Sequence, residues 1–120
     1  MEAYFTLDTH RQEEGKEIFA ITLNRKHPVY KGHFPDVPVT PGVVLTDICR
    51  QLAEHALDKK LQLKEAKTIK FLAMVNPEMT PALDVEMMLS AENERYAARI
   101  VGSFEGKTYF KIQADFAGEL

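Results

Sequence analysis

Apolar residues recur at steps of three and four through one segment in the middle of the chain. This spacing places them on one side of a helix and predicts an amphipathic helix over residues 43 to 58. The apolar positions of this segment are Val44, Leu45, Ile48, Cys49, Leu52, Ala53 and Ala56. A polar stretch over residues 59 to 65 is expected to lead the chain away from the helix.

Elsewhere the pattern is that of strands, in which apolar and polar residues alternate. Strands are expected over residues 3 to 10, 16 to 23, 68 to 75, 83 to 91, 96 to 104 and 108 to 116. Turn residues at Glu14-Gly15 and Glu105-Gly106 make hairpins of the adjoining strands. Two strands, one long helix and then further strands predict an α+β fold, with an antiparallel sheet of five to six strands around one helix. We expect residues 1–120 to form a single domain.

Residues 24 to 41 separate the second predicted strand from the helix. This segment carries Pro28, Pro35, Pro38 and Pro41, a density that excludes a long helix or a central strand. It is expected to be an ordered loop that ends at a helix N-terminus, where free N–H groups favour negative charge.

Composition narrows the function classes. The chain has 120 residues and a formal net charge of −3, so no general affinity for nucleic acid is implied. No apolar run reaches the length of a membrane-spanning helix and no signal pattern opens the chain, so we expect a cytoplasmic protein without membrane contact. The single cysteine, Cys49, is expected to be a packed thiol, and His27 and His55 fit no metal-ligand spacing. The methionines at 74, 79, 87 and 88 are interpreted as core residues, with tunnel lining as the alternative.

The loop and the helix start carry a dense set of motifs. They are Gly32-His33-Phe34-Pro35, then Pro38-Val39-Thr40-Pro41-Gly42-Val43, then Asp47 and Gln51. Together they resemble the signature of the 3-hydroxyacyl-[acyl-carrier-protein] dehydratases, which have the hot-dog fold. Lys70-Phe71 followed by Pro77 is similar to a later segment of that family. The chain departs from the pattern at Asp47, where glutamate is commoner, and at Thr40, Arg50 and Glu78.

The resemblance implies a lyase that removes water from 3-hydroxyacyl thioesters on acyl carrier protein and gives trans-2-enoyl thioesters, in fatty acid or a related specialised acyl or polyene pathway. His33 would be the general base, and Asp47 the acid, acting directly or through a held water. Substrate-binding residues would be Phe34, Gly42, Val43 and Gln51, with the Gly42 N–H on the thioester oxygen and Gln51 orienting Asp47. No metal and no cofactor are implied beyond the phosphopantetheine of the carrier. The implied assembly is a homodimer with shared active sites, able to assemble further.

Alternatives remain open at this point. A hot-dog acyl thioesterase would use the helix carboxylate without needing the Gly32-His33-Phe34-Pro35 unit, and a non-catalytic acyl-binding subunit would need neither His33 nor Asp47. Taken alone, a loop histidine more often satisfies backbone carbonyls, and a first-turn aspartate more often stabilises the helix dipole. Lys31, Arg50 and Lys70 could meet a phosphate or an acidic carrier, but solvated surface charge is the simpler interpretation.

Overall fold

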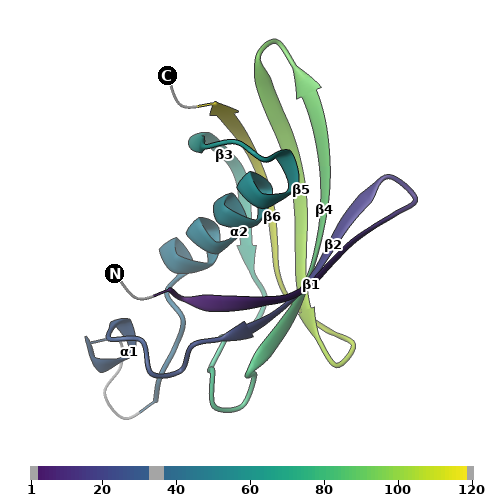
Figure 1. Ribbon diagram of the computed structural model, residues 1–120. Coiled ribbons are helices and arrows are strands. Elements are labelled where there is room, and N and C mark those ends of the chain that lie inside the picture. Colours follow the sequence, from purple (N-terminus) through teal and green to yellow (C-terminus); the bar gives the residue numbers. More distant parts are fainter. Residues whose placement is uncertain (1–2, 33–36, 119–120) are drawn as a thin grey trace.

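The computed structural model describes residues 3–32 and 37–118. Figure 1 shows a long helix lying across one face of a curved sheet. The helices are α1 (Val29–Gly32) and α2 (Gly42–Leu57). The strands are β1 (Phe5–Glu13), β2 (Lys16–Leu23), β3 (Leu61–Phe71), β4 (Ala82–Glu92), β5 (Arg95–Phe104) and β6 (Lys107–Gly118).

The six strands form one sheet in the order β1-β2-β4-β5-β6-β3, and every neighbouring pair is antiparallel. β3 follows α2 in sequence but pairs with β6, so the helix crosses the sheet between the two halves of the chain. The predicted α+β fold with one central helix and an antiparallel sheet of up to six strands is thereby confirmed. That residues 1–120 make one domain stays a prediction.

Helix α2 buries the apolar face that its sequence spacing predicts. Pro41 precedes the helix in an extended conformation, and Asp58 ends it with a left-handed backbone (φ 52°). The buried residues are Val44, Leu45, Ile48, Cys49, Leu52 and Ala53. They pack against inward-facing residues of the sheet, among them Phe19, Ile21, Val85, Met87, Ile100, Phe110, Ile112 and Phe116. Because this face is completely covered by the sheet, only the other side of the helix can take part in a surface site.

Two local predictions are wrong. The segment expected to be a polar helix exit contains the start of β3 at Leu61, and β3 ends at Phe71, whereas the sequence had predicted a strand over residues 68 to 75. The pairing of β3 with β6 has irregularities between Leu63 and Glu65 and between Ala66 and Thr68. Each irregularity adds a residue that the partner strand does not match, so apolar residues stop alternating along β3.

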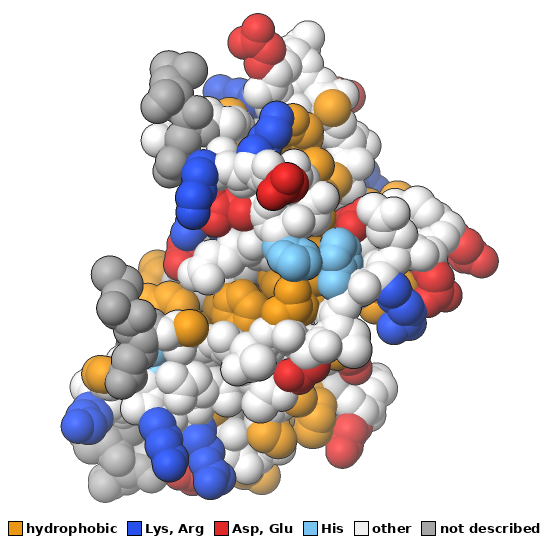
Figure 2. All heavy atoms as spheres, viewed as in Figure 1, with side chains coloured by type: hydrophobic (Ala, Val, Ile, Leu, Met, Phe, Trp, Pro, Cys, Tyr) orange, Lys and Arg blue, Asp and Glu red, His pale blue; other side chains and the backbone are white. Residues whose placement is uncertain are grey.

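Some large apolar side chains remain exposed. Met87 lies in the core as predicted, but Met74, Met79 and Met88 do not. The other exposed apolar side chains are Val37, Val43, Leu63, Ile69, Phe71 and Leu72, several of them in or directly after β3. Figure 2 shows hydrophobic side chains gathered in a band across the middle of one face. β3 lies at one edge of the sheet, and the exposed Leu63, Ile69 and Phe71 make its surface more apolar than that of an ordinary exposed edge.

Candidate active site

The loop before helix α2 is held in place by hydrogen bonds on both of its sides. The backbone N–H of Thr40 donates to the carbonyl of Val75 at 2.8 Å, and the Thr40 hydroxyl bonds the Tyr30 hydroxyl at 2.8 Å. Both side chains are buried. Burial raises the pKa of Tyr30, while the hydrogen bond with Thr40 opposes that shift. The threonine that departs from the family pattern is thus part of a buried polar contact that fixes the helix start.

In the first turn of α2, the carbonyls of Pro41 and Gly42 accept hydrogen bonds from the residues that follow. The N–H groups of Val44 and Leu45 donate to the carbonyl of Pro41, and the Thr46 hydroxyl donates to the carbonyl of Gly42 at 3.0 Å. Within the described part of the chain, no side chain caps this N-terminus. A helix start without a side-chain cap keeps donors for an external acceptor, as expected for the predicted role of the Gly42 N–H.

Asp47 lies one turn into α2, and both of its oxygens accept hydrogen bonds. The Gln51 amide donates to Oδ2 at 2.9 Å, and Nε of Arg50 donates to Oδ1 at 2.9 Å. The contact with Gln51 is the one that the spacing of four residues predicts. The Asp47 side chain is 37% exposed, so the carboxylate is held firmly while part of it still faces solvent.

Arg50 links this carboxylate to a second acid. Nη1 of Arg50 lies 2.9 Å from Glu54 Oε2, and the same oxygen of Glu54 accepts the backbone N–H of Leu61 at 2.8 Å. Burial alone would lower the pKa of Arg50, but hydrogen bonds and the negative charges of Asp47 and Glu54 outweigh it and raise that pKa above its ordinary value. The interpretation of Arg50 as a solvated surface charge is therefore wrong. Its spacing of three residues from Asp47 and four from Glu54 was the available signal.

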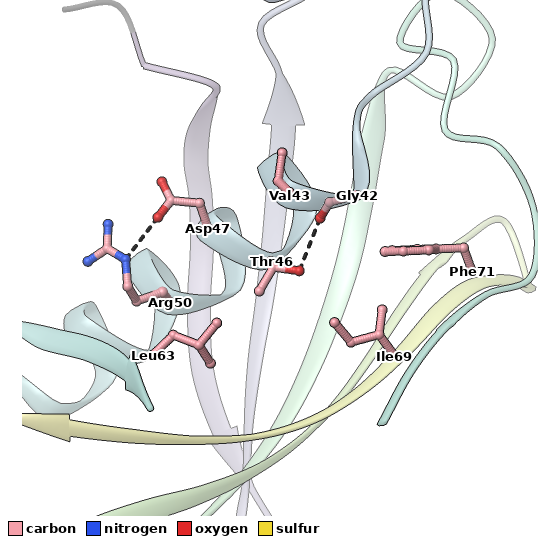
Figure 3. A pocket seen from close by; sticks show the side chains of 8 residues that line it. All are labelled: Gly42, Val43, Thr46, Asp47, Arg50, Leu63, Ile69 and Phe71. Atoms are coloured by element: carbon pink, nitrogen blue, oxygen red, sulfur yellow. Dashed lines mark hydrogen bonds and ion pairs between the residues drawn. The ribbon is translucent and has the colours of Figure 1, made fainter. Parts of the chain in front are cut away.

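An open cavity of about 500 Å³ lies between the exposed side of α2 and strand β3 (Figure 3). The helix contributes Gly42, Val43, Thr46, Asp47 and Arg50, and the strand contributes Leu63, Ile69 and Phe71. Figure 3 shows Asp47 and Arg50 at one side of the cavity, the Phe71 ring at the opposite side, and Ile69 and Leu63 along its floor. A carboxylate at the rim of an apolar cavity suits a substrate with a polar reacting end and a hydrocarbon tail.

The remaining predicted site residues have different outcomes. Gly42 and Val43 line the same cavity as Asp47, and Gln51 touches Asp47 without lining the cavity itself. His33 and Phe34 lie outside the described residues. The roles given to all six stay predictions.

The histidines outside the candidate site, His10, His27 and His55, contact neighbouring side chains and backbone groups. Nδ1 of His27 accepts the backbone N–H of Val29 at 3.0 Å, and the ring lies against Tyr4. His55 meets the edge of His10, whose Nε2 lies 2.7 Å from Glu17. Across residues 3–32 and 37–118, no three His, Cys, Asp or Glu side chains are grouped so that they could hold a metal ion. None of the helices in the same ranges is both long enough and apolar enough to cross a membrane.

Comparisons with known proteins place this geometry in a family. Residues 9–110 match the family described as ApeI-like, ApeI dehydratase. The 3-hydroxyacyl-[acyl-carrier-protein] dehydratase FabZ of Ruminiclostridium cellulolyticum is 28% identical over 113 residues, which cover 88% of this chain and 79% of the relative. FabZ of Staphylococcus carnosus is 34% identical over 83 residues, covering 62% of this chain and 57% of that protein.

Solved structures with the same fold carry different activities. The dehydratase heterocomplex ApeI:P from Xenorhabdus doucetiae superposes with a TM-score of 0.73 and 16% identity, over 94% of this chain and 97% of that one. A mutant thioesterase from Pseudomonas aeruginosa gives a TM-score of 0.64 at 9% identity, over 94% of this chain and 79% of its own. At such identities the likeness shows the hot-dog fold alone, so the family match decides between the two activities. The expected resemblance and the expected lyase class are confirmed: the chain belongs to the ApeI-like dehydratase family.

Proposed function

We propose that this dehydratase removes water from 3-hydroxyacyl thioesters carried on the phosphopantetheine arm of an acyl carrier protein and releases trans-2-enoyl thioesters. The observation that carries the proposal is the Asp47 carboxylate, fixed by Gln51 and Arg50 at the rim of an apolar cavity. The apolar floor suits the acyl chain, and the carboxylate suits the hydroxyl that leaves. The Ruminiclostridium relative, whose name states this substrate, supports the same assignment.

In the proposed reaction His33 takes the proton from C2. The electron pair of that C–H bond forms the C2=C3 double bond, and the C3–O bond breaks as Asp47, in its protonated carboxyl form, supplies a proton to the hydroxyl, which departs as water. The Gly42 N–H, at the uncapped helix start, stabilises the negative charge on the thioester oxygen. These steps use a base, an acid and a polarised carbonyl, so we propose that no cofactor takes part.

The side chain of Asp47 is one carbon shorter than that of glutamate and is held along the helix by Gln51 and Arg50. Because these bonds turn it toward neighbours on its own helix, we propose that a water relays the proton between Asp47 and the substrate hydroxyl. The protonated carboxyl has one O–H to donate to such a water, which then passes a proton on to the departing hydroxyl.

We also propose that two copies of the chain pair as a homodimer through strand β3. This edge strand spans 11 residues and exposes the side chains of Leu63, Ile69 and Phe71. A long apolar edge is a liability for an isolated chain, because its unpaired backbone groups and apolar side chains attract another strand. In such a dimer the cavity beside β3 lies next to the partner, and we propose that His33 of one copy serves Asp47 of the other.

Sedimentation of the purified chain tests this assembly, with a dimer expected. The Xenorhabdus neighbour is described as a heterocomplex, so a chain that stays monomeric would indicate that a different subunit takes the second place. In that case the homodimer is overturned, and activity should appear only after the second chain is added.

The decisive experiment is mass spectrometry of 3-hydroxyacyl thioesters of several chain lengths on acyl carrier protein, incubated with the parent, His33→Ala and Asp47→Asn. His27→Ala is the matched control, because His27 also lies in the loop and its ring contacts Val29 and Tyr4. We expect loss of one water with the parent and the control, and none with the two site variants. Release of free carrier thiol would instead indicate a thioesterase, and an unchanged substrate with a folded protein would indicate an acyl-binding subunit.

A further inference from the structure

The ring of Phe71 lies directly against the first residue of helix α2. A methyl group placed on Gly42 would come within 2.6 Å of Cζ and 2.7 Å of Cε2 of Phe71, too close for any real side chain. The contact therefore exists only because residue 42 has no Cβ. Because residue 42 is glycine, the helix start can pack against the aromatic ring of Phe71 from β3.

This contact separates two cavities. On one side is the cavity of about 500 Å³ that Asp47 borders, and on the other is a second cavity of about 360 Å³. Gly42 and Phe71 line both of them, and Figure 3 shows the ring at the end of the first cavity opposite Asp47 and Arg50. The second cavity continues along Val39, Thr40, Leu45, Leu72, Met74 and Val75. The ring of Phe71 thus lies at the border that these two mostly apolar cavities share.

Phe71 can be changed without opening the core of the protein. Its side chain is 50% exposed, whereas the neighbouring Phe110 on β6 is only 1% exposed. Phe71 is also the last residue of β3, so its truncation does not interrupt the strand. A smaller residue at this position should join the two cavities while the sheet and the helix keep their places.

We propose that Phe71 sets the upper limit of acyl chain length by closing the far end of the cavity that begins at Asp47. This inference rests on the proposed function, since it takes the occupant of that cavity to be the acyl chain of a thioester. A chain that fills the first cavity is accepted, and further methylenes meet the ring. Without the ring, those methylenes enter the second cavity and are buried there.

The test measures equilibrium binding of saturated acyl-pantetheine thioesters of increasing length by calorimetry. These probes lack the 3-hydroxyl group, so they report on the cavity without turnover. Each methylene that enters an apolar cavity should tighten binding about fourfold until the cavity is full. In the parent we expect this gain in affinity to stop at a defined acyl chain length. In Phe71→Ala it should continue for several more carbons, and in Phe71→Leu it should stop at an intermediate length.

Leu72→Ala is the matched control, because Leu72 lines only the second cavity. It should leave the length limit of the parent unchanged. An unchanged limit in Phe71→Ala, checked as folded by circular dichroism, or an equal shift in Leu72→Ala, would overturn the proposal.

The closing experiment pairs these binding curves with turnover of a short 3-hydroxyacyl thioester by the parent. Turnover together with an unshifted limit overturns the role of Phe71 and keeps the dehydratase. A shifted length limit without turnover supports the role of Phe71 and overturns the dehydratase activity. If no probe binds the parent saturably, both proposals are overturned.

Discussion

Replacing Arg50 by methionine tests whether the ion pairs of helix α2 hold Asp47 in place. Methionine keeps the apolar stem of the side chain and removes the guanidinium. Asp47 Oδ1 then loses its donor and Glu54 Oε2 loses its cationic partner. Gln51 still holds Asp47 Oδ2, so the carboxylate keeps one of its two contacts within the chain.

The size of the effect follows from the exposure of the three side chains. Arg50 is 25% exposed, Asp47 37% and Glu54 17%, so neither pair is fully solvated or fully buried. Pairs at the surface contribute about 0 to 1 kcal/mol, and buried hydrogen bonds to charged groups contribute about 1.5 to 3 kcal/mol. For two pairs between these limits we expect the variant to lose about 2 kcal/mol of unfolding free energy. For a chain of this size that loss lowers Tm by roughly 8 °C.

Activity should respond differently from stability. A carboxylate with one anchor instead of two samples positions away from the leaving hydroxyl, and a misplacement on the order of 1 Å can cost about 100-fold in rate. We expect kcat to fall about 10-fold to 100-fold while KM stays within about threefold, because substrate binding depends mainly on the cavity. The kcat of Arg50→Lys should lie between those of the parent and Arg50→Met, since an ammonium group cannot bond both acids in the planar geometry of a guanidinium.

The assay combines thermal unfolding by circular dichroism with kcat and KM on a 3-hydroxyacyl thioester. Arg99→Met, on the exposed side of β5, serves as the matched loss of one positive charge. An Arg50→Met protein that melts within about 2 °C of the parent and keeps its kcat would refute the reasoning. Asp47 would then be positioned without Arg50, and the pairs would be worth no more than ordinary surface contacts.

Three further predictions concern the core and the loop. Gly102→Ala should destabilise the protein by about 1 to 3 kcal/mol in urea unfolding, because its methyl group would overlap the ring of the buried Phe110; an unchanged midpoint would show that the ring can shift. Burial raises the pKa of Cys49 from 9.0 to about 12, so between these values the thiol ionises only in the unfolded chain. The parent should therefore lose stability relative to Cys49→Ala as the pH rises from about 9 toward 12, and parallel curves would contradict this. Tyr30→Phe leaves the buried Thr40 hydroxyl without its partner and should cost about 1 to 3 kcal/mol, whereas the double variant with Thr40→Val should recover part of that loss; equal thermal unfolding of Tyr30→Phe and the parent would show that the contact is weak.

The regular part of the fold was predictable because its elements have an unbroken period. Helix α2 places apolar residues at steps of three and four over four turns, and its bounds differ from the prediction by one residue at each end. Strands β4, β5 and β6 instead alternate apolar and polar residues, and their predicted bounds have only small errors at the ends. In these elements, local sequence pattern and tertiary burial agree.

Strand β3 could not be predicted in the same way, because two irregularities in its pairing with β6 interrupt the alternation of apolar and polar residues. Leu63, Ala66, Ile69 and Phe71 lie opposite the inward-facing residues Phe116, Ala114, Ile112 and Phe110 of β6. Their separations are three, three and two residues, so the strand does not alternate over its length. The polar residues between them were interpreted as the end of the helix region, and only the partner strand reveals the register.

The candidate site was partly predictable for a similar reason. Asp47 and Gln51 are four residues apart on one helix, so their contact follows from the sequence alone. The pairing of Arg50 with Asp47 and Glu54 follows from the same rule, although the sequence alone was interpreted as placing a solvated surface charge at this position. The contact of Phe71 with Gly42 joins residues 29 positions apart, and no local pattern encodes it.

The two irregularities of β3 also determine where this chain can change in length. Lys64 and Lys67 are the residues that have no counterpart on β6 at these points. Deleting one of them would restore regular pairing and leave Leu63, Ile69 and Phe71 directed toward the helix. Deleting a matched residue such as Lys70 would instead turn Phe71 away from Gly42 and expose the helix start. We therefore expect relatives with a shorter strand here to lack residues at these two lysine positions, and loss of a matched residue to accompany loss of the cavity.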